Sequence, residues 1–197
     1  MKPTKDEYEL KSFKTKYESI SGLELPYEYL RNSKVYIFKR NQEIIGGYIL
    51  GKSTPLRTVD LFISSDNQMS LNSLFSKEKY CEVCCFWISR KFRKSPYLNA
   101  KFWLSMANEV RKQEKEIIVY GTNSKGLAKL YDYPQVSTLF HKDKIQNKNT
   151  YVFMSRRNKF LGGAFRIVMS KVLRKTRRSD LKINFKLKNE LTNELST

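Results

Sequence analysis

The sequence predicts a mixed α/β domain (α/β or α+β) in which strands and helices alternate, followed by a basic C-terminal extension. Two observations predict this class. Short runs rich in β-branched and aromatic residues recur, as in YCEVCCFWIS at residues 80–89. Between these runs lie segments whose apolar residues repeat every three or four positions, as in an amphipathic helix. Such alternation is typical of a mixed central sheet with flanking helices.

The first part of the chain predicts a helix and then a β-hairpin. The helix covers residues 5–20 and ends at Ser21 and Gly22. Its apolar residues at roughly helical spacing are Tyr8, Phe13 (or Leu10), Tyr17 and Ile20. The hairpin covers residues 35–49 around the polar turn KRNQE. Inside its second strand, Gly46 and Gly47 indicate a bulge or a close approach of the backbone.

The middle of the chain contains the clearest strand and the clearest helix. Residues 51–79 are polar and weakly patterned and support no definite assignment. The run at 80–89 reads as a buried strand. The helix follows Pro96, with Ser95 suited to its N-cap. Apolar residues then recur every fourth position at Leu98, Phe102, Met106 and Val110.

The C-terminal half completes the domain and adds an extension. EIIVYG predicts a strand, SKGLAKLYDY a helix, and VSTLFH and TYVFMSR two strands separated by a polar turn at 142–149. We therefore expect one domain over residues 1–157 and a basic extension over 158–197. Within the extension, a basic amphipathic helix is expected at 158–178. Its apolar stripe is Leu161, Phe165, Val168, Met169, Val172 and Leu173.

The charge of the chain is strongly positive and unevenly distributed. The formal net charge is +19, and residues 142–188 hold 15 lysines and arginines against two aspartates. Such a balance predicts an acidic partner, which could be an acidic protein, an anionic membrane surface or nucleic acid. The helix at 158–178 could equally pack on its own domain.

Other features narrow the location and chemistry of the protein. No apolar run is long enough to span a membrane, and the N-terminus lacks a signal-peptide pattern, so we expect a cytoplasmic protein, with peripheral attachment to a membrane as an alternative. The three cysteines, at 81, 84 and 85, form one CxxC without a second pair, and the chain has a single histidine. A structural zinc site usually needs four ligands, so no metal is expected.

The order of elements over about residues 5–155 resembles the GNAT superfamily, the Gcn5-related N-acetyltransferases. The hairpin with Gly46-Gly47 resembles the family's second and third strands. Residues 81–103 resemble its fourth strand, pyrophosphate loop and following helix. IIVYGTNSKGLAKLYDYP resembles its fifth strand, the asparagine after it and the next helix, where Leu130-Tyr131-Asp132 stands for the usual Leu-Tyr-Glu.

The resemblance implies a site between two splayed parallel strands. A pantetheine arm lies between the strands, and Asn123 contacts that arm or caps the next helix. Tyr131 is the implied proton donor to the leaving thiolate, and thus the catalytic residue. The alternative is that Tyr131 only packs its helix against the sheet.

One part of the family pattern is altered here. The pyrophosphate loop, Arg/Gln-x-x-Gly-x-Gly/Ala in the family, reads Arg93-Lys-Ser-Pro-Tyr-Leu98 and has lost both glycines. Proline offers no N–H to a phosphate. The clustered basic side chains of Arg90, Lys91, Arg93 and Lys94 could replace the backbone cradle. The cofactor-binding candidates are Arg90, Arg93, Lys94, Ser95 and Asn123. A solvated basic loop is the alternative.

The resemblance implies an acyltransferase that moves an acyl group from a pantetheine thioester to an amine acceptor of unknown identity. The implied donor is acyl-CoA or acyl carrier protein. Acyl carrier protein would suit the altered loop because it carries a single phosphodiester instead of a pyrophosphate, and its acidic surface would suit a basic enzyme. His141 or Asp60 could act as the base, on residue type alone. The alternative function is an inactive GNAT-like module whose basic C-terminus binds nucleic acid or an anionic membrane.

Overall fold

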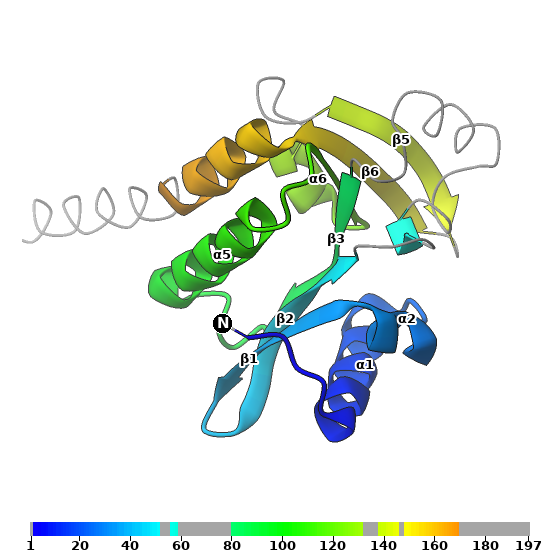
Figure 1. Ribbon diagram of the computed structural model, residues 1–197, viewed down its shortest axis with the longest axis vertical. Helices are drawn as coiled ribbons and strands as arrows, with labels where there is room; N and C mark the ends of the chain where they lie inside the picture. Colours follow the sequence, from blue (N-terminus) through cyan, green and yellow to red (C-terminus); the bar gives the residue numbers. More distant parts are fainter. Residues whose placement is uncertain (1, 52–55, 59–79, 132–137, 146–147, 170–197) are drawn as a thin grey trace, which may run out of the picture.

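A computed structural model describes residues 2–51, 56–58, 80–131, 138–145 and 148–169 (Figure 1). The described strands form one six-stranded sheet in the order β1-β2-β3-β4-β6-β5. Only β3 and β4 run parallel, and all other neighbours are antiparallel. The elements are α1 (Glu7–Ser21), α2 (Tyr27–Asn32), β1 (Lys34–Arg40), β2 (Glu43–Gly51), β3 (Tyr80–Ile88), α5 (Pro96–Arg111), β4 (Ile117–Thr122), α6 (Lys125–Tyr131), β5 (Thr138–Ile145) and β6 (Lys148–Arg156).

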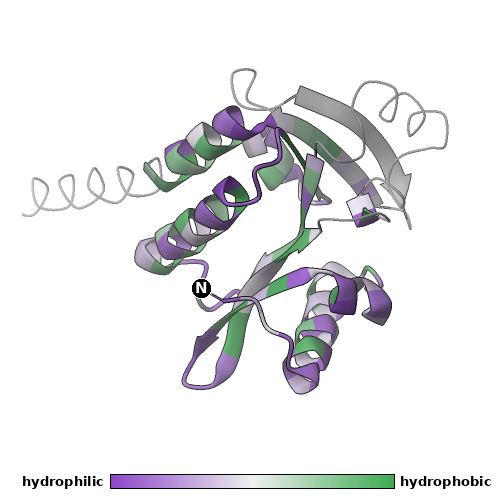
Figure 2. Cartoon of the chain, viewed as in Figure 1, coloured by the Kyte–Doolittle hydropathy of each residue, from purple (hydrophilic) through white to green (hydrophobic). Residues whose placement is uncertain are grey.

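The predicted fold class is confirmed: the protein is a mixed sheet with helices on both faces. Alternate residues of the central strands belong to two separate apolar cores, as at Val119 and Tyr120 on β4. The first core contains residues of α1 and α2, and the second contains residues of α5. Figure 1 shows these helices on opposite sides of the sheet, and Figure 2 shows apolar residues along its central strands.

Helix α1 begins and ends close to the residues that the sequence indicates. The Asp6 side chain accepts a hydrogen bond from the Glu9 backbone N–H at 2.8 Å. Gly22 ends the helix with a φ of 65°, a left-handed conformation that glycine adopts without steric cost. Phe13 and Tyr17 face the sheet and are buried, whereas Tyr8 and Ile20 are exposed. One end of α1 therefore brings Tyr17 close to the middle of the sheet.

The β1–β2 hairpin turns at Asn41 and Gln42, whose positive φ values of 49° and 62° are typical of a tight hairpin turn. The close approach predicted at Gly46 and Gly47 is confirmed. A Cβ atom on Gly47 would lie 2.6 Å from the Phe13 ring and 2.6 Å from the Tyr36 carbonyl oxygen. This glycine therefore lets α1 pack directly on the hairpin.

The prediction of a polar turn at 142–149 is wrong, because most of those residues lie in strands. β5 continues to Ile145, and β6 begins at Lys148. Their backbones pair in register, with Lys142 opposite Tyr151. Polar side chains are compatible with an edge strand, since only one of its edges is paired.

The first part of the predicted basic helix is present over residues 157–169, but its buried face differs from the predicted stripe. Phe165 is 56% exposed and Met169 38% exposed. The buried residues are Phe160, Ala164, Ile167 and Val168, and they belong to the same core as α5. This face therefore packs on the domain. Residues 170–178 lie outside the described part of the chain.

No helix among the described residues is both long enough and apolar enough to cross a membrane.

The glycine contact between the hairpin and α1 gives a stability test. We expect Gly47→Ala to lower the free energy of unfolding by about 1–3 kcal/mol, because the added methyl group must displace the Phe13 ring or the backbone. Thermal and urea unfolding followed by circular dichroism measure the change.

Gly162→Ala is the matched control. Gly162 is exposed in the helix over 157–169, and a Cβ atom there meets nothing within 4 Å. Alanine at this position should raise the free energy of unfolding by about 0.5–1 kcal/mol through helix propensity. Equal shifts for the two variants would contradict the close packing at Gly47.

Candidate functional site

The site is organised by the point at which the parallel strands β3 and β4 stop pairing. Their ladder runs from Tyr80 opposite Ile117 to Val83 opposite Tyr120. β3 continues to Ile88 and β4 to Thr122, with no further pairing between them in the described residues. The central sheet therefore opens into a gap beyond Val83, as the resemblance to splayed strands implies.

A β-bulge in β3 accompanies this separation. Ile49 on β2 lies opposite Cys84, whereas Gly47 lies opposite Trp87, so β3 has an extra residue in this interval. Cys85 has a φ of 51°, which is unusual for a residue other than glycine. Bulges bend a strand and increase its twist. Here the bulge directs the end of β3 away from β4.

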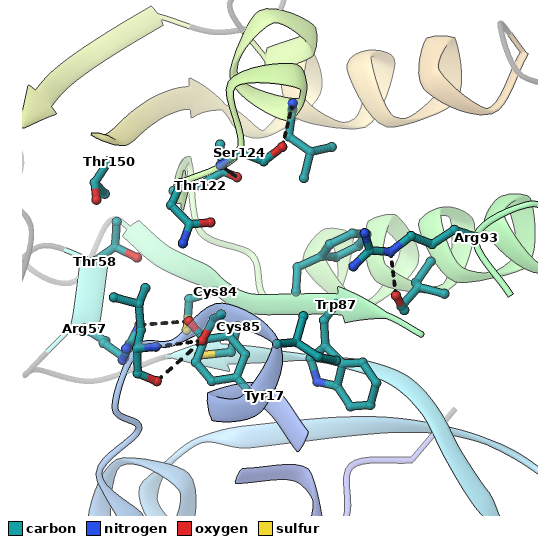
Figure 3. A pocket seen from close by; sticks show the side chains of 18 of the residues that line it. Tyr17, Arg57, Thr58, Cys84, Cys85, Trp87, Arg93, Thr122, Ser124 and Thr150 are labelled. Atoms are coloured by element: carbon teal, nitrogen blue, oxygen red, sulfur yellow. Dashed lines mark hydrogen bonds between the residues drawn. The ribbon is translucent and has the colours of Figure 1, made fainter. Parts of the chain in front are cut away.

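A cavity of about 410 Å³ occupies the gap (Figure 3). Residues from both faces of the sheet line it. Tyr17 and Leu23 belong to the core on the α1 side, and Trp103 belongs to the core on the α5 side. Gly121, Thr122, Asn123 and Ser124 contribute the end of β4. The cavity thus lies between β3 and β4 with residues of both faces of the sheet around it. Groups on either face could therefore contact a ligand bound there.

The start of α5 forms one end of the site. Ser95 is the N-cap, as predicted, and its hydroxyl accepts from the Leu98 N–H at 3.3 Å. The Asn99 side-chain amide donates to the Arg93 and Ser95 carbonyls, each at 2.8 Å. The loop is therefore held by side-chain contacts and turn hydrogen bonds rather than by glycine conformations.

The predicted phosphate-binding side chains divide into two groups. Arg93 lines the cavity, and its Nε donates to the Ile88 carbonyl at 2.7 Å. Arg90, Lys91 and Lys94 are exposed and do not line the cavity. Ser95 caps α5 and also lies outside the lining set. All four cations of this loop are therefore exposed, and of the four only Arg93 lines the cavity.

Asn123 lines the cavity after the end of β4. The cap of α6 is Ser124, whose hydroxyl accepts from the Leu127 N–H at 3.4 Å and whose carbonyl accepts from the Ala128 N–H at 2.8 Å. Of the two roles considered for Asn123, helix capping is thus carried out by its neighbour. The other role, contact with a pantetheine arm, stays a prediction.

Tyr131, at the end of α6, is partly buried, packs against the core on the α5 side and is not one of the residues that line the cavity. Its ring centroid lies 5.2 Å from Tyr120, 5.5 Å from Phe153 and 6.2 Å from Trp103. Burial raises the pKa of Tyr131 above its usual value, with a smaller effect of Tyr120. This environment favours the packing alternative, and the proton-donor role stays a prediction.

The candidate bases fall outside the described part of the structure. Asp60 lies in a segment that is not described, and the side chain of His141 is not described although its backbone belongs to β5. Both assignments therefore stay predictions. Within the described residues, no group of histidine, cysteine or acidic side chains could hold a metal ion.

Arg57 is a cavity residue that sequence analysis missed, because residues 51–79 have no recognisable pattern. It is 5% exposed. Its guanidinium donates to the Glu24 carbonyl at 2.6 Å and to the Tyr17 hydroxyl at 3.5 Å, and it lies 5.6 Å from the Tyr17 ring centroid. The cation is thus fixed on the α1 side of the sheet.

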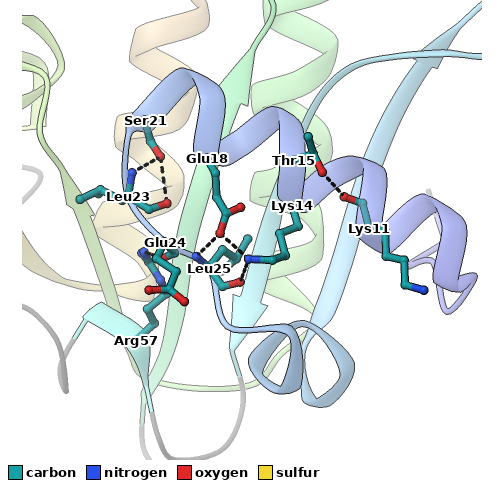
Figure 4. A network of polar contacts seen from close by, with 9 residues as sticks. All are labelled: Lys11, Lys14, Thr15, Glu18, Ser21, Leu23, Glu24, Leu25 and Arg57. Carbon is teal, nitrogen blue, oxygen red and sulfur yellow. Dashed lines mark hydrogen bonds and ion pairs between the residues drawn. The ribbon is translucent and has the colours of Figure 1, made fainter.

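The loop that receives Arg57 is itself held by ion pairing (Figure 4). Glu18 pairs with Lys14 and accepts from the Leu25 N–H at 2.7 Å. Lys14 also donates to the Leu25 carbonyl at 2.9 Å. The hydrogen bond from Lys14 lowers the pKa of Glu18, so this carboxylate stays ionised. The contacts fix the backbone beside Glu24, which binds Arg57.

Glu82 is a second polar residue that the sequence hid, since it lies in the apolar run of β3. Its carboxyl is buried and accepts from the Tyr29 hydroxyl at 2.8 Å and from the backbone and side chain of Thr58. Burial raises the pKa of Glu82, while these donors and Arg57 oppose the change. Glu82 therefore holds the segment that carries Arg57 against β3.

The cysteines are free and buried, and Cys84 and Cys85 line the cavity. Burial raises the pKa of the Cys84 thiol well above its usual value. The Cys84 sulfur lies 3.2 Å from the Tyr29 hydroxyl. A protonated, hydrogen-bonded thiol is a poor nucleophile, so we assign Cys84 a packing role.

Comparison with solved structures identifies the fold. FeeM, an N-acyl amino acid synthase from uncultured soil microbes, aligns with a TM-score of 0.58 and 11% identity, covering 77% of this chain and 91% of FeeM. The CoA-dependent acyl-homoserine lactone synthase BjaI, solved with SAM and isopentyl-CoA, aligns with a TM-score of 0.57 and 12% identity over 82% and 83% of the chains.

A third similar structure is a putative acetyltransferase of the GNAT family from Desulfovibrio desulfuricans. Its TM-score is 0.51 at 7% identity, and the alignment covers 79% of this chain and 96% of that one. No protein-family model and no curated protein sequence matches this chain. At these identities the likeness concerns the fold. The chain therefore has a divergent GNAT-like fold, as its sequence resemblance implies.

Proposed function

We propose that the protein is an acyltransferase that moves an acyl group from a pantetheine thioester to an amine. The observation that carries this proposal is the cavity between the separated ends of β3 and β4, which residues from both faces of the sheet line. A thioester and an amine can meet there from opposite sides. The fold likeness to an N-acyl amino acid synthase and an acyl-homoserine lactone synthase supports the same reaction class.

The geometry suits an addition–elimination reaction. The amine nitrogen attacks the thioester carbon, and the carbonyl oxygen becomes negatively charged in the tetrahedral intermediate. Backbone N–H groups near the bulge at Cys85 are suited to stabilise this oxygen, since β3 no longer pairs with β4 there. The C–S bond then breaks, and the proton lost by the amine balances the thiolate.

The donor approaches from the α5 side in this proposal. Arg93 would bind a donor phosphate at the cavity, and Asn123 would contact the pantetheine arm. The exposed cations Arg90 and Lys94 lie on the loop just outside. They suit either the further phosphates of acyl-CoA or the acidic surface of acyl carrier protein.

Donor binding is the first test. Octanoyl-CoA should bind the purified protein in native mass spectrometry and titration calorimetry, and Arg93→Gln should weaken binding about tenfold, because one charge-assisted phosphate contact is lost. Arg93→Lys keeps the charge and should retain most of the affinity. The same measurements with octanoyl-acyl carrier protein decide between the two donors.

Arg111→Gln is the matched control, since Arg111 is an exposed cation at the other end of the same helix. Its affinity for octanoyl-CoA should equal that of the wild type. A protein that ignores both thioesters and co-purifies with nucleic acid would overturn the enzyme proposal and support the binding-module alternative.

Tyr131→Phe separates the two roles considered for this tyrosine. The packing observed around its ring leads us to expect a kcat within a few-fold of wild type, because phenylalanine keeps the same aromatic contacts. Steady-state thiol release with octanoyl-CoA and an amine measures kcat. A loss of about 100-fold or more, at an unchanged Tm, would instead establish the proton-donor role.

A further inference from the structure

The charged side chains among the described residues that line the cavity are all positive. Two arginines line it, Arg57 and Arg93. Of the described residues that line the cavity, none is an aspartate or a glutamate. Figure 3 shows the two arginines well apart, with Arg57 beside Tyr17 and Arg93 beyond Trp87. Such a cavity favours anionic groups at two separate positions.

In the proposed function, Arg93 binds the donor phosphate, whereas Arg57 has no assigned ligand. Arg93 precedes α5 and lies where the donor phosphate would bind. Arg57 contacts Tyr17 and the Glu24 carbonyl, which belong to the α1 side of the sheet. A second anion bound at Arg57 is therefore on the side from which the acceptor must approach.

Arg57 has the properties of a prepared binding group. Its side chain is nearly fully buried, and its guanidinium is oriented by a carbonyl and by an aromatic ring. Glu82 holds the adjacent Thr58 in place, yet the Glu82 carboxyl is not one of the cavity-lining groups. A fixed guanidinium loses little conformational entropy when it pairs with a planar anion.

An acyl chain is a poorer occupant of this end than an anion. An alkyl chain placed against a buried guanidinium offers the charge neither a hydrogen-bond acceptor nor a counter-charge. A carboxylate supplies two acceptor oxygens in the plane of the guanidinium fork. The Thr58 side chain lines the same end of the cavity, next to Arg57.

We infer that the amine acceptor carries a carboxylate and that Arg57 binds it from the α1 side of the gap. This inference rests on the proposed acyl transfer and names its acceptor class, the amino acids. In an α-amino acid the amine and the carboxylate are bonded to the same carbon. Anchoring the carboxylate at Arg57 therefore directs the amine toward the thioester in the gap beyond Val83.

The test compares acceptors that differ only in charge. Wild-type protein is incubated with octanoyl-CoA and the twenty standard amino acids, or with the corresponding amino acid amides, and N-octanoyl products are identified by mass spectrometry. For the best acceptor, kcat/KM should exceed that of its amide by about tenfold or more, through KM, since a charged hydrogen-bonded pair is lost.

Arg57 is then tested by substitution. Arg57→Gln should abolish the preference for amino acid over amide, and Arg57→Lys should restore part of it. Arg31→Gln is the matched control: Arg31 also lies over a tyrosine ring, that of Tyr27 at 5.1 Å, but is exposed and does not line the cavity. It should keep the preference.

Equal acylation of amides and amino acids by wild-type protein would overturn the inference, even if Arg57→Gln does not fold.

A binding measurement separates this inference from the proposed function. N-octanoylglycine and N-octanoylglycinamide are titrated into the wild-type protein by calorimetry. Tighter binding of the carboxylate, lost in Arg57→Gln, partly kept in Arg57→Lys and unchanged in Arg31→Gln, supports the Arg57 site without any catalysis. Equal affinities overturn it, even where octanoyl-CoA binds and transfers its acyl group normally.

Discussion

The structure depends on the end of one β-ladder. Among the described strands, β3 and β4 are the only parallel neighbours, and they pair over Tyr80–Val83 and Ile117–Tyr120 before they separate. Antiparallel pairing with β2 and β6 holds each strand on its outer edge, so the sheet stays intact on both sides of the gap. The bulge at Cys85 turns β3 away from β4. The central sheet, which would otherwise be continuous, therefore contains the gap that the cavity occupies.

The two faces of the sheet contribute different cations to this cavity. On the α5 side, the loop before the helix brings Arg93 to the cavity and leaves Arg90 and Lys94 exposed around it. On the α1 side, the Lys14–Glu18 pair fixes the loop that binds Arg57. The proposed donor and acceptor sides rest on this separation. The cavity thus has two cations at separate positions, although the loop before α5 lacks the usual glycines.

Local signals in the sequence determined most of the framework. The N-cap at Ser95, the terminating Gly22, the hairpin turn and the apolar spacing of α5 each depend on contacts between residues close in the chain, and each is present as expected. The first half of β5 was predicted as a strand, but its polar second half was predicted as a turn, because pairing with β6 overrides the weak local preference of these residues. The apolar stripe of the helix over 157–169 was misplaced because several faces of that segment carry apolar residues, and only packing selects one.

For the site, the sequence by itself identified the elements that surround the cavity. It also identified Arg93 and Asn123 as residues near it, because both follow strands of recognisable pattern. The tertiary structure decided which side chains face the cavity. The predicted site residue Tyr131 packs its ring against the core and does not line the cavity. Arg57, from a segment without a recognisable pattern, does line it. Arg57 contacts Tyr17 and Glu24, which are 40 and 33 residues away in the chain. A local pattern carries no information about such contacts, because they form only when the hairpin, β3 and α1 come together around the gap.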